Sequence, residues 1–186
     1  GSDWKSWKIR DLETGADLSD SVEWSKFSGT AWRPDGSGFF YARYEAPKDG
    51  EGLIEVNENQ ELWYHVPGTS QDKDVLVHRD SDNPTWGFSP TVSEDGRYLI
   101  ISTWRGGEPN KVSYVDLSKD DWTVVPLIDN FDNAWSFVGN DAGYLYFNTN
   151  MDSPRGRLVG FDIADPTAAR EIIPEQESTL RGISHI

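Results

Sequence analysis

Four stretches of this chain repeat one pattern, an alternating apolar and polar run that ends in turn-forming residues. They are WKIRDLETG (Trp7–Gly15), LWYHVPGTS (Leu62–Ser70), VSYVDLSKD (Val112–Asp120) and LVGFDIADP (Leu158–Pro166), and corresponding positions lie 55, 50 and 46 residues apart. Alternation with a period of two is typical of strands that bury one face. A unit of this length made of short strands cannot bury its own apolar faces, whereas stacked units can. A period of about 40–50 residues is typical of four-stranded propeller blades.

The segments between these repeats supply the other strands of each unit. First strands are expected at Gly29–Arg33, Ser89–Val92, Ser136–Gly139 and Gly182–Ile186, and second strands at Phe39–Tyr44, Tyr98–Thr103 and Tyr144–Thr149. Fourth strands are expected at Asp17–Val22, Asp74–His78, Thr123–Ile128 and Arg170–Ile173. No window has the periodicity of an amphipathic helix of ordinary length. We therefore predict an all-β fold, an arc of a β-propeller with three complete four-stranded antiparallel blades and partial blades at both ends.

The turns between first and second strands also repeat, as RPDGSG, SEDGRY and NDAGYL. Asp35-Gly36 and Asp95-Gly96 are hairpin dipeptides, because glycine accepts a positive φ and aspartate tolerates one. Asp141-Ala142-Gly143 is a one-residue expansion of the same turn. The one long connection, Ala46–Gln60, is acidic and contains glycine, so we expect a loop on one face of the propeller.

The order of the strands argues against a closed ring. The chain opens on a third strand and ends on a first strand, so a blade composed of both ends would lack its second strand. Unpaired strand edges promote aggregation, and natural proteins avoid them. We therefore interpret the chain as part of a larger propeller, and we expect the chain alone to be marginally stable or to self-associate. The first residue is Gly1 rather than Met, which is consistent with a cut N-terminus.

Composition excludes several classes of partner. Among 186 residues, 32 acidic and 17 basic side chains give a net charge of −15, which disfavours nucleic acids and anionic membrane surfaces. No stretch approaches the roughly 20 apolar residues of a membrane span. The absence of cysteine excludes disulfides and thiolate chemistry. It suits a reducing compartment, so a cytoplasmic location is expected, with the bacterial periplasm as the alternative.

Motifs for catalysis are missing from the sequence. There is no G-x-S-x-G nucleophile elbow and no H-E-x-x-H zinc motif, so no catalytic residue, metal or cofactor is predicted. His65 and His78 fall within expected strands and are interpreted as face or edge residues. The run Asp129–Asn133 lacks the glycine and the final glutamate of an EF-hand loop, and it is interpreted as a turn. Packing roles are expected for three tryptophans, Trp86, Trp104 and Trp135.

Long stretches of the chain resemble the propeller domain of the prolyl oligopeptidase family, serine endopeptidases that cleave after proline in short peptides. They are FSGTAWRPDGSGFFYARYEAP (Phe27–Pro47), ELWYHVPGTSQDKDVLV (Glu61–Val77), SEDGRYLIISTWRGGEPN (Ser93–Asn110) and VPLIDNFDNAWSFVGNDAGYLYFNTNMDSPRGRLVGFDI (Val125–Ile163). The opening GSDW is similar to that of family members as well. The resemblance runs from end to end, and several long motifs in the same order argue against chance similarity.

The resemblance implies a seven-bladed propeller that caps an α/β-hydrolase domain carrying the catalytic Ser, Asp and His. In that reading residues 1–186 are a single partial propeller domain, and the hydrolase domain of the same polypeptide lies outside this chain. The implied segments are the end of one blade (4–27), complete blades at 28–80, 88–130 and 135–176, and the first strand of the next blade (179–186). The propeller would act as a filter that admits short proline-containing peptides to an enclosed active site.

The resemblance also implies residues that contact substrate. The family motif places one at Phe27, whose ring would pack against an apolar peptide side chain or, alternatively, is simply a hydrophobic residue at a blade edge. Another falls at Trp104, where mammalian members carry Arg, whereas here Arg105 follows the tryptophan. Stacking is therefore expected there in place of a charge contact. Gly87 and Gly107 match positions where mammalian members have Met and Cys, so those contacts are not expected, and the loop Ala46–Gln60 matches a family loop that faces the hydrolase domain.

Two other functions stay open from the sequence. The chain could be a stand-alone binding propeller similar to TolB-type repeats, whose blades share a Pro-Asp-Gly turn such as Pro34-Asp35-Gly36. It could also belong to another oligopeptidase of the same clan with a preference for basic residues. Primary specificity resides in the hydrolase domain, so this chain does not decide between the two directly. The match of its motifs favours the prolyl branch.

Overall fold

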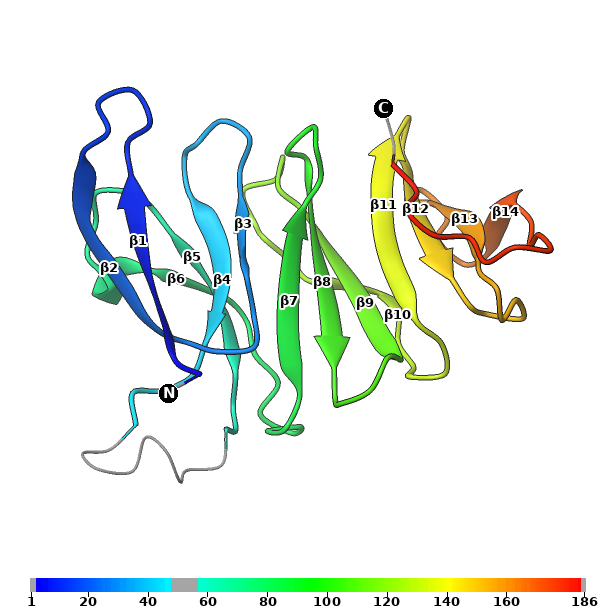
Figure 1. The fold of residues 1–186 in the computed structure, drawn as a ribbon, viewed down its shortest axis with the longest axis horizontal. Helices are drawn as coiled ribbons and strands as arrows, with labels where there is room; N and C mark the ends of the chain where they lie inside the picture. The colour runs from blue at the N-terminus through cyan, green and yellow to red at the C-terminus, as the bar shows by residue number, and fades with distance from the viewer. Residues whose placement is uncertain (1–2, 48–56, 185–186) are drawn as a thin grey trace. The chain divides into compact units, whose positions relative to one another are not determined.

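The computed structural model describes residues 3–47 and 57–184 of the chain (Figure 1). Within this part the chain forms fourteen β-strands, one short 3-10 helix and no α-helix. The strands are β1 (Lys5–Arg10), β2 (Asp17–Ser25), β3 (Thr30–Trp32), β4 (Phe39–Arg43), β5 (Glu61–His65), β6 (Val75–His78), β7 (Gly87–Val92), β8 (Tyr98–Trp104), β9 (Asn110–Asp116), β10 (Val125–Ile128), β11 (Trp135–Asp141), β12 (Tyr144–Thr149), β13 (Arg157–Asp162) and β14 (Ala169–Ile173). The helix η1 (Gln71–Lys73) precedes β6.

The described strands form one two-stranded sheet and three four-stranded sheets. The small sheet pairs β1 with β2, and the larger ones have the orders β3-β4-β5-β6, β10-β9-β8-β7 and β11-β12-β13-β14. Strands that follow one another in the sequence therefore pair within each sheet. The chain divides into two compact units, Gly1–Val92 and Ser93–Ile186, and each is described by itself. This architecture confirms the predicted all-β fold with three complete four-stranded sheets.

The second strand of a sheet is the most deeply buried where its sequence is continuously apolar. In β4 the run FFYA is buried throughout, and in β8 the run YLII is buried as well. β12 instead alternates, with Leu145, Phe147 and Thr149 buried. β4 and β12 each pair with a strand on both sides, which satisfies their backbone groups away from water.

The predicted hairpin turns form through their glycines. Gly36 and Gly96 adopt φ of 71° and 73°, and Gly143 adopts 87°. In the first turn the Gly36 N–H donates to the Arg33 carbonyl at 2.9 Å, and the Ser37 N–H donates to the Asp35 carboxylate at 2.9 Å. Aspartate therefore acts by accepting a backbone hydrogen bond, while the glycine takes the left-handed conformation.

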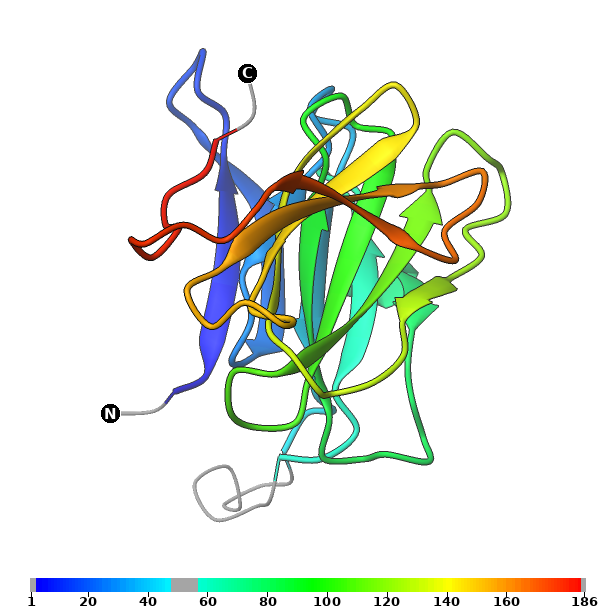
Figure 2. The same ribbon diagram turned by 90° about the vertical axis from the view of Figure 1, so that its right-hand side faces the viewer.

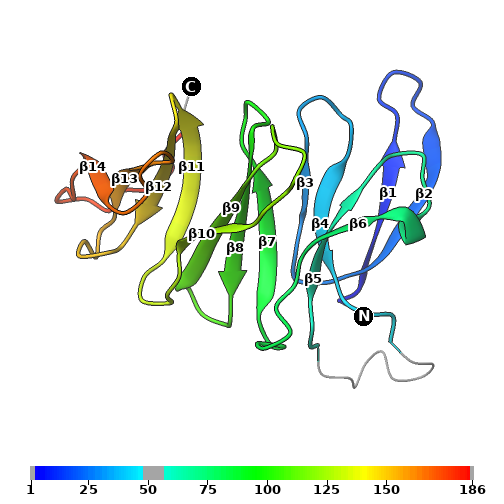
Figure 3. The same ribbon diagram turned by 180° about the vertical axis from the view of Figure 1, so that it is seen from behind.

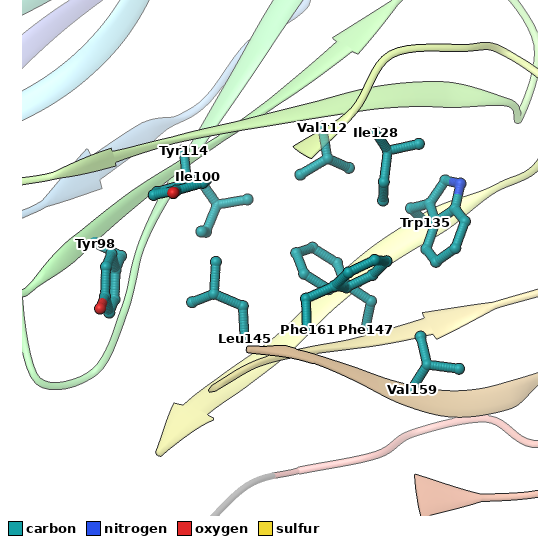
Figure 4. Close-up of a cluster of buried hydrophobic side chains, with 10 residues drawn as sticks. All are labelled: Tyr98, Ile100, Val112, Tyr114, Ile128, Trp135, Leu145, Phe147, Val159 and Phe161. Atoms are coloured by element: carbon teal, nitrogen blue, oxygen red, sulfur yellow. The ribbon is translucent and has the colours of Figure 1, made fainter. Parts of the chain in front are cut away.

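The core of the second unit lies between two of its sheets (Figure 4). Ten buried side chains meet there: Tyr98, Ile100, Val112, Tyr114, Ile128, Trp135, Leu145, Phe147, Val159 and Phe161. The Phe147 ring lies 6.0 Å from that of Phe161 and 6.4 Å from that of Trp135, both edge to face. Trp135 is therefore a core residue, as predicted. Burial of the inner faces is what holds the sheet β11–β14 to its neighbour in this unit.

The first unit has a smaller aromatic core between the β1–β2 sheet and β4. Ile9 and Val22 pack with Phe39 and Tyr41, and Trp7 lies against this group. Helix η1 contacts β2, as Figure 3 shows from behind. The side chain of Gln71 makes this contact, because its Oε1 accepts the Glu23 N–H at 3.0 Å and its Nε2 donates to the Glu23 carbonyl at 3.1 Å. The sequence analysis did not predict this helix.

A first strand was predicted after β14, at Gly182–Ile186. No strand is formed over residues 182–184, and residues 185 and 186 lie outside the described part. The residues that precede this range after β14 bond to the turn before β13, red beside orange in Figure 2. There the Leu180 N–H donates to the Arg155 carbonyl at 2.7 Å, and the Arg155 guanidinium donates to the Glu177 carbonyl at 3.0 Å.

The long connection predicted at Ala46–Gln60 joins β4 to β5. Its described ends, residues 46–47 and 57–60, contain no strand, and residues 48–56 lie outside the described part. Among the described residues, no helix has the length and apolar character needed to cross a bilayer.

Candidate functional site

Strand order gives each four-stranded sheet two ends that carry different connections. The connections between first and second strands and between third and fourth strands lie at one end, which we call the hairpin end. The connection between second and third strands lies at the opposite end, together with the links to the next sheet, and we call this the loop end. The loop end of the sheet β3–β6 carries the long connection between β4 and β5. Loops held by a rigid scaffold commonly carry binding residues.

Each predicted substrate residue lies at the loop end of its own sheet. Phe27 follows β2, in the link from the small sheet to β3. Trp104 is the last residue of β8, and Arg105 opens the connection from β8 to β9. Phe27 belongs to the first compact unit, and the other two belong to the second.

The loop end of the first unit contains a pocket of about 600 Å³. Four segments form its wall: the residue before β1, both described ends of the β4–β5 connection, and the start of the β6–β7 connection. The lining residues are Trp4, Tyr44, Glu45, Ala46, Asn57, Glu58, Asn59, Gln60, Glu61, Arg79, Asp80 and Ser81. The predicted loop Ala46–Gln60 therefore contributes to the pocket through the ends that the structure describes.

Aromatic rings build one side of this pocket. Trp4 meets Trp24 and Tyr44 edge to face, with ring centroids 5.9 and 6.0 Å apart. Burial raises the pKa of Tyr44 to about 12, so its hydroxyl stays protonated at neutral pH. The Lys26 ammonium lies 4.9 Å from the centre of the Trp4 ring and 5.1 Å from that of Phe27. Lys26 therefore connects Phe27 to the pocket wall, and the Phe27 side chain remains 50% exposed.

The backbone around Phe27 is unusual. Trp24 and Phe27 adopt positive φ values of 64° and 56°, a conformation that bulky side chains rarely take. Two hydrogen bonds hold the chain in place there: the Tyr44 N–H donates to the Trp24 carbonyl at 3.0 Å, and the buried Ser25 hydroxyl donates to the Ala42 carbonyl at 2.8 Å. Strain of this kind persists only where the surroundings determine the conformation, and it is concentrated at functional sites.

Gln60 organises the base of the pocket. Its side chain is buried, and its Nε2 donates to the Lys26 carbonyl at 2.9 Å while its Oε1 accepts the Phe88 N–H. The Lys26 ammonium also donates to Asn57 Oδ1 at 3.2 Å. One amide thus joins the link after β2, the end of the long connection and the start of β7. Sequence analysis missed Trp4, Lys26 and Gln60 as site residues, although Lys26 adjoins Phe27.

The rim of the pocket is acidic. Glu45, Glu58 and Glu61 contribute carboxylates, and Glu61 accepts the indole N–H of Trp63 at 3.1 Å. Arg79 lies 3.8 Å from the Glu61 carboxylate. The Asp80 carboxylate is already engaged in a turn, since it accepts the backbone N–H of Asn83 at 3.1 Å. The net negative rim favours ligands with a positive group over anions.

In the second unit, Arg105 lies over an aromatic ring. Its guanidinium carbon is 4.4 Å from the centre of the Phe131 ring, and the Lys111 ammonium is 5.4 Å from the same centre. Lys111 also pairs with the Asp129 carboxylate at 2.7 Å. A guanidinium over a ring keeps donors for a carboxylate in the plane of its fork. Phe131 was not predicted, although it stands within the turn interpreted from Asp129–Asn133.

Trp104 is half-buried at the same end, beside a fixed amide. It pairs across the sheet with Asn110, whose side chain donates to Ser102 Oγ at 2.9 Å and accepts the Trp135 N–H at 2.8 Å. Gly106 and Gly107 follow with φ of 90° and 83°, which residues with side chains rarely adopt. The backbone conformation at position 107 therefore favours glycine over a residue with a side chain.

His65 was predicted as a face or edge residue of a strand, and it lies in the interior strand β5 with no exposed surface. Its ring nitrogens contact Asp20 and Asp74. It is sealed from substrate and therefore has no catalytic geometry. The described part of the chain contains no group of three His, Cys, Asp or Glu side chains arranged to hold a metal ion.

Comparison with known proteins identifies the family to which this propeller belongs. The family model described as the N-terminal β-propeller domain of prolyl oligopeptidase matches residues 1–185. The chain belongs to the prolyl oligopeptidase family. A prolyl endopeptidase from Elizabethkingia meningoseptica is 33% identical over 182 residues, which cover 97% of this chain and 26% of that protein.

Solved structures of the family share the fold. A structure from a study of two prolyl endopeptidases superposes with a TM-score of 0.88 at 29% identity, over 98% of this chain and 26% of that one. Prolyl oligopeptidase B from Galerina marginata, bound to a 35mer hydrolysis and macrocyclization substrate, gives 0.85 at 28% identity, over 95% and 26%. The chain therefore spans about a quarter of the length of these relatives.

Proposed function

We propose that this chain is the substrate-filtering part of a serine-type post-proline endopeptidase that acts on short peptides. In this proposal the catalytic α/β-hydrolase domain belongs to the same parent polypeptide and packs against the loop ends of the sheets. The observation that carries the proposal is the position of Phe27, Trp104 and Arg105. All three substrate residues implied by the family motif stand at the loop end of their own sheet.

The chemistry of acyl transfer gives such a filter a physical purpose. Hydrogen-bond donors that stabilise a developing oxyanion act most strongly where water is excluded. A propeller that covers the hydrolase excludes bulk water and folded proteins, while short peptides still enter. The filter therefore contributes to the rate as well as to the choice of substrate.

The loop ends offer two distinct contacts to a bound peptide. Phe27 presents an exposed ring beside the Lys26 ammonium, which suits an apolar or aromatic side chain. Arg105 over Phe131 presents hydrogen-bond donors that suit a peptide carboxylate. Both contacts would act on residues away from the scissile bond, so they should matter more for extended peptides than for minimal substrates.

The test uses the full-length protein and two Gly-Pro reporter peptides, one minimal and one extended by several residues. Phe27→Ala should raise KM for the extended peptide about two- to tenfold, the range expected for one aromatic contact. The minimal reporter should be cleaved as before. Trp32→Ala is the matched control, because Trp32 is 42% exposed but ends β3 at the hairpin end of the same sheet.

A second pair of variants applies the same logic to charge. Arg105→Ala should weaken binding of extended peptides that end in a carboxylate, whereas Arg97→Ala should not. Arg97 also lies over a ring, 5.0 Å from the centre of Tyr98, but it stands at the hairpin end of its sheet. Equal effects of both members of a pair would contradict the proposed orientation. A full-length protein with no post-proline cleavage would contradict the function itself and support a binding module.

A further inference from the structure

A buried polar cluster of the first unit, centred on His65, joins two of its sheets. Its Nδ1 lies 2.7 Å from Asp74 Oδ1 and its Nε2 lies 3.1 Å from Asp20 Oδ1, and the three side chains have no exposed surface. Asp20 belongs to β2 and His65 to β5, while Asp74 follows helix η1. The contacts therefore link the β1–β2 sheet to the sheet β3–β6.

The surrounding hydrogen bonds define where protons can reside. Asp20 Oδ1 also accepts the Gly68 N–H at 2.7 Å, and Asp74 Oδ2 accepts the Tyr41 hydroxyl at 2.6 Å. The second distance falls in the range of bonds to an ionised carboxylate. Asp20 Oδ2 is buried without a hydrogen-bond partner, so a proton on that atom would be a buried donor with no acceptor. The contacts of Asp74 thus fit an ionised carboxylate, and a proton on Asp20 Oδ2 is excluded. The competing arrangement is a proton on Asp20 Oδ1 that is donated to a neutral ring, and ¹⁵N NMR of the ring nitrogens distinguishes the two.

Two ionised carboxylates can both be satisfied by His65 only if each ring nitrogen carries a proton, because a neutral imidazole has one donor. We propose that His65 is an imidazolium in the folded protein and that it acts as a proton-dependent latch between the two sheets. Loss of this proton would set one ring nitrogen lone pair against a carboxylate oxygen. The latch should therefore weaken under alkaline conditions.

The charges around the latch do not supply another partner for the imidazole. Tyr41 on β4 faces Asp74, and burial together with this hydrogen bond raises the pKa of Tyr41 far above its usual value. Arg43 on β4 opposes that rise. Asp72 and Lys73 in η1 are exposed, as is Glu23 on β2. The two buried carboxylates are thus the groups that contact the ring nitrogens.

The latch makes folding take up one proton above the pH at which a histidine titrates in an unfolded chain, about 6.5. Between pH 7.5 and 9 the unfolding equilibrium constant of the full chain should therefore rise about tenfold per pH unit. Asp74→Asn should remove this extra slope, because the amide can donate to Nδ1 and still accept from Tyr41. In ¹⁵N NMR at pH 7.5, both His65 ring nitrogens should be protonated in the original chain, and one should not be in Asp74→Asn.

His78 provides the matched control. It is half-buried and its ring packs against Phe88 at 4.8 Å, and burial lowers its pKa, so it takes up no proton in this range. His78→Gln should keep the slope and simplify assignment of the His65 signals. A neutral His65 ring by NMR overturns the proposal without recourse to any variant. A slope between pH 7.5 and 9 that is the same with and without Asp74→Asn also overturns it.

Discussion

Gly38 leaves no room for a side chain. A Cβ at this position would collide with the backbone carbonyl of His65 and with the ring of Tyr64. The carbonyl cannot move away without disturbing β5, which also carries the buried His65 side chain. We therefore expect Gly38→Ala to lower the free energy of unfolding by about 1–3 kcal/mol, the usual cost of overpacking. Urea denaturation monitored by tryptophan fluorescence measures this change.

Gly29 is the control for this prediction, because a Cβ there meets nothing within 4 Å and its φ is ordinary. Gly29→Ala should change the free energy of unfolding by no more than about 0.5 kcal/mol, as at other surface sites. Equal losses for the two variants would show that the collision is relieved elsewhere.

The site residues that the sequence predicted are those that a local motif marks. Phe27, Trp104 and Arg105 were predicted because each falls in or beside a sequence motif that resembles the family. Lys26 and Gln60 are 34 residues apart and His65 and Asp20 are 45 apart, and each contact depends on how two sheets meet. Local patterns carry no signal for such pairs. An isolated histidine in an alternating strand was therefore interpreted as an ordinary strand residue.

Among structural elements, the turn between β7 and β8 shows how one carboxylate can fix a hairpin. Asp95 accepts the Ser93 hydroxyl at 2.6 Å, the Arg97 N–H at 3.0 Å and the Asn140 amide at 2.8 Å. Partial burial raises the pKa of Asp95, but these hydrogen bonds lower it by more, so the folded value lies below the ordinary 3.8. The stabilisation that the ionised Asp95 gives the folded chain is therefore complete above the ordinary pKa of 3.8, and it is lost as the pH falls through the lower pKa of the folded state.

This gives a prediction for acid unfolding. Asp95→Asn should cost more stability at pH 6 than at pH 3, because the ionised carboxylate is a better acceptor than the protonated acid that replaces it at low pH. Urea unfolding of both chains at the two pH values gives the difference. Asn140→Ala removes one of the three donors and should produce a smaller effect of the same sign. A cost for Asp95→Asn that is equal at both pH values would rule out the carboxylate as the cause.

The strands themselves were largely predictable. Period-two alternation and Asp-Gly turns found every strand that forms in residues 3–47 and 57–184, with ends displaced by a few residues. β2 runs to Ser25 rather than Val22, because its last residues pair with the start of β1. The predicted strand at Gly182–Ile186 does not form over its described residues, 182–184, and the residues just before them, Glu177 and Leu180, bond to the turn before β13. Strand formation depends on a partner, which a local pattern does not reveal.

At the scale of the whole molecule, the small sheet differs from the other three. In each four-stranded sheet the third strand pairs on both sides, as β5 does with β4 and β6. β1 is the equivalent third strand, yet among the described residues it pairs with β2 alone. Its other edge therefore presents backbone donors and acceptors that can pair with another chain.

Charge opposes such pairing. A net charge of −15 makes two copies of the chain repel each other, and this repulsion extends over about 30 Å at 0.01 M salt but only about 8 Å at 0.15 M. We therefore expect the isolated chain to self-associate with increasing concentration, and more strongly at 0.15 M salt than at 0.01 M. Sedimentation velocity over a tenfold range of concentration should show a rising sedimentation coefficient at the higher salt. A compact monomer at every concentration and at both salts would show that the edge of β1 is protected within the chain.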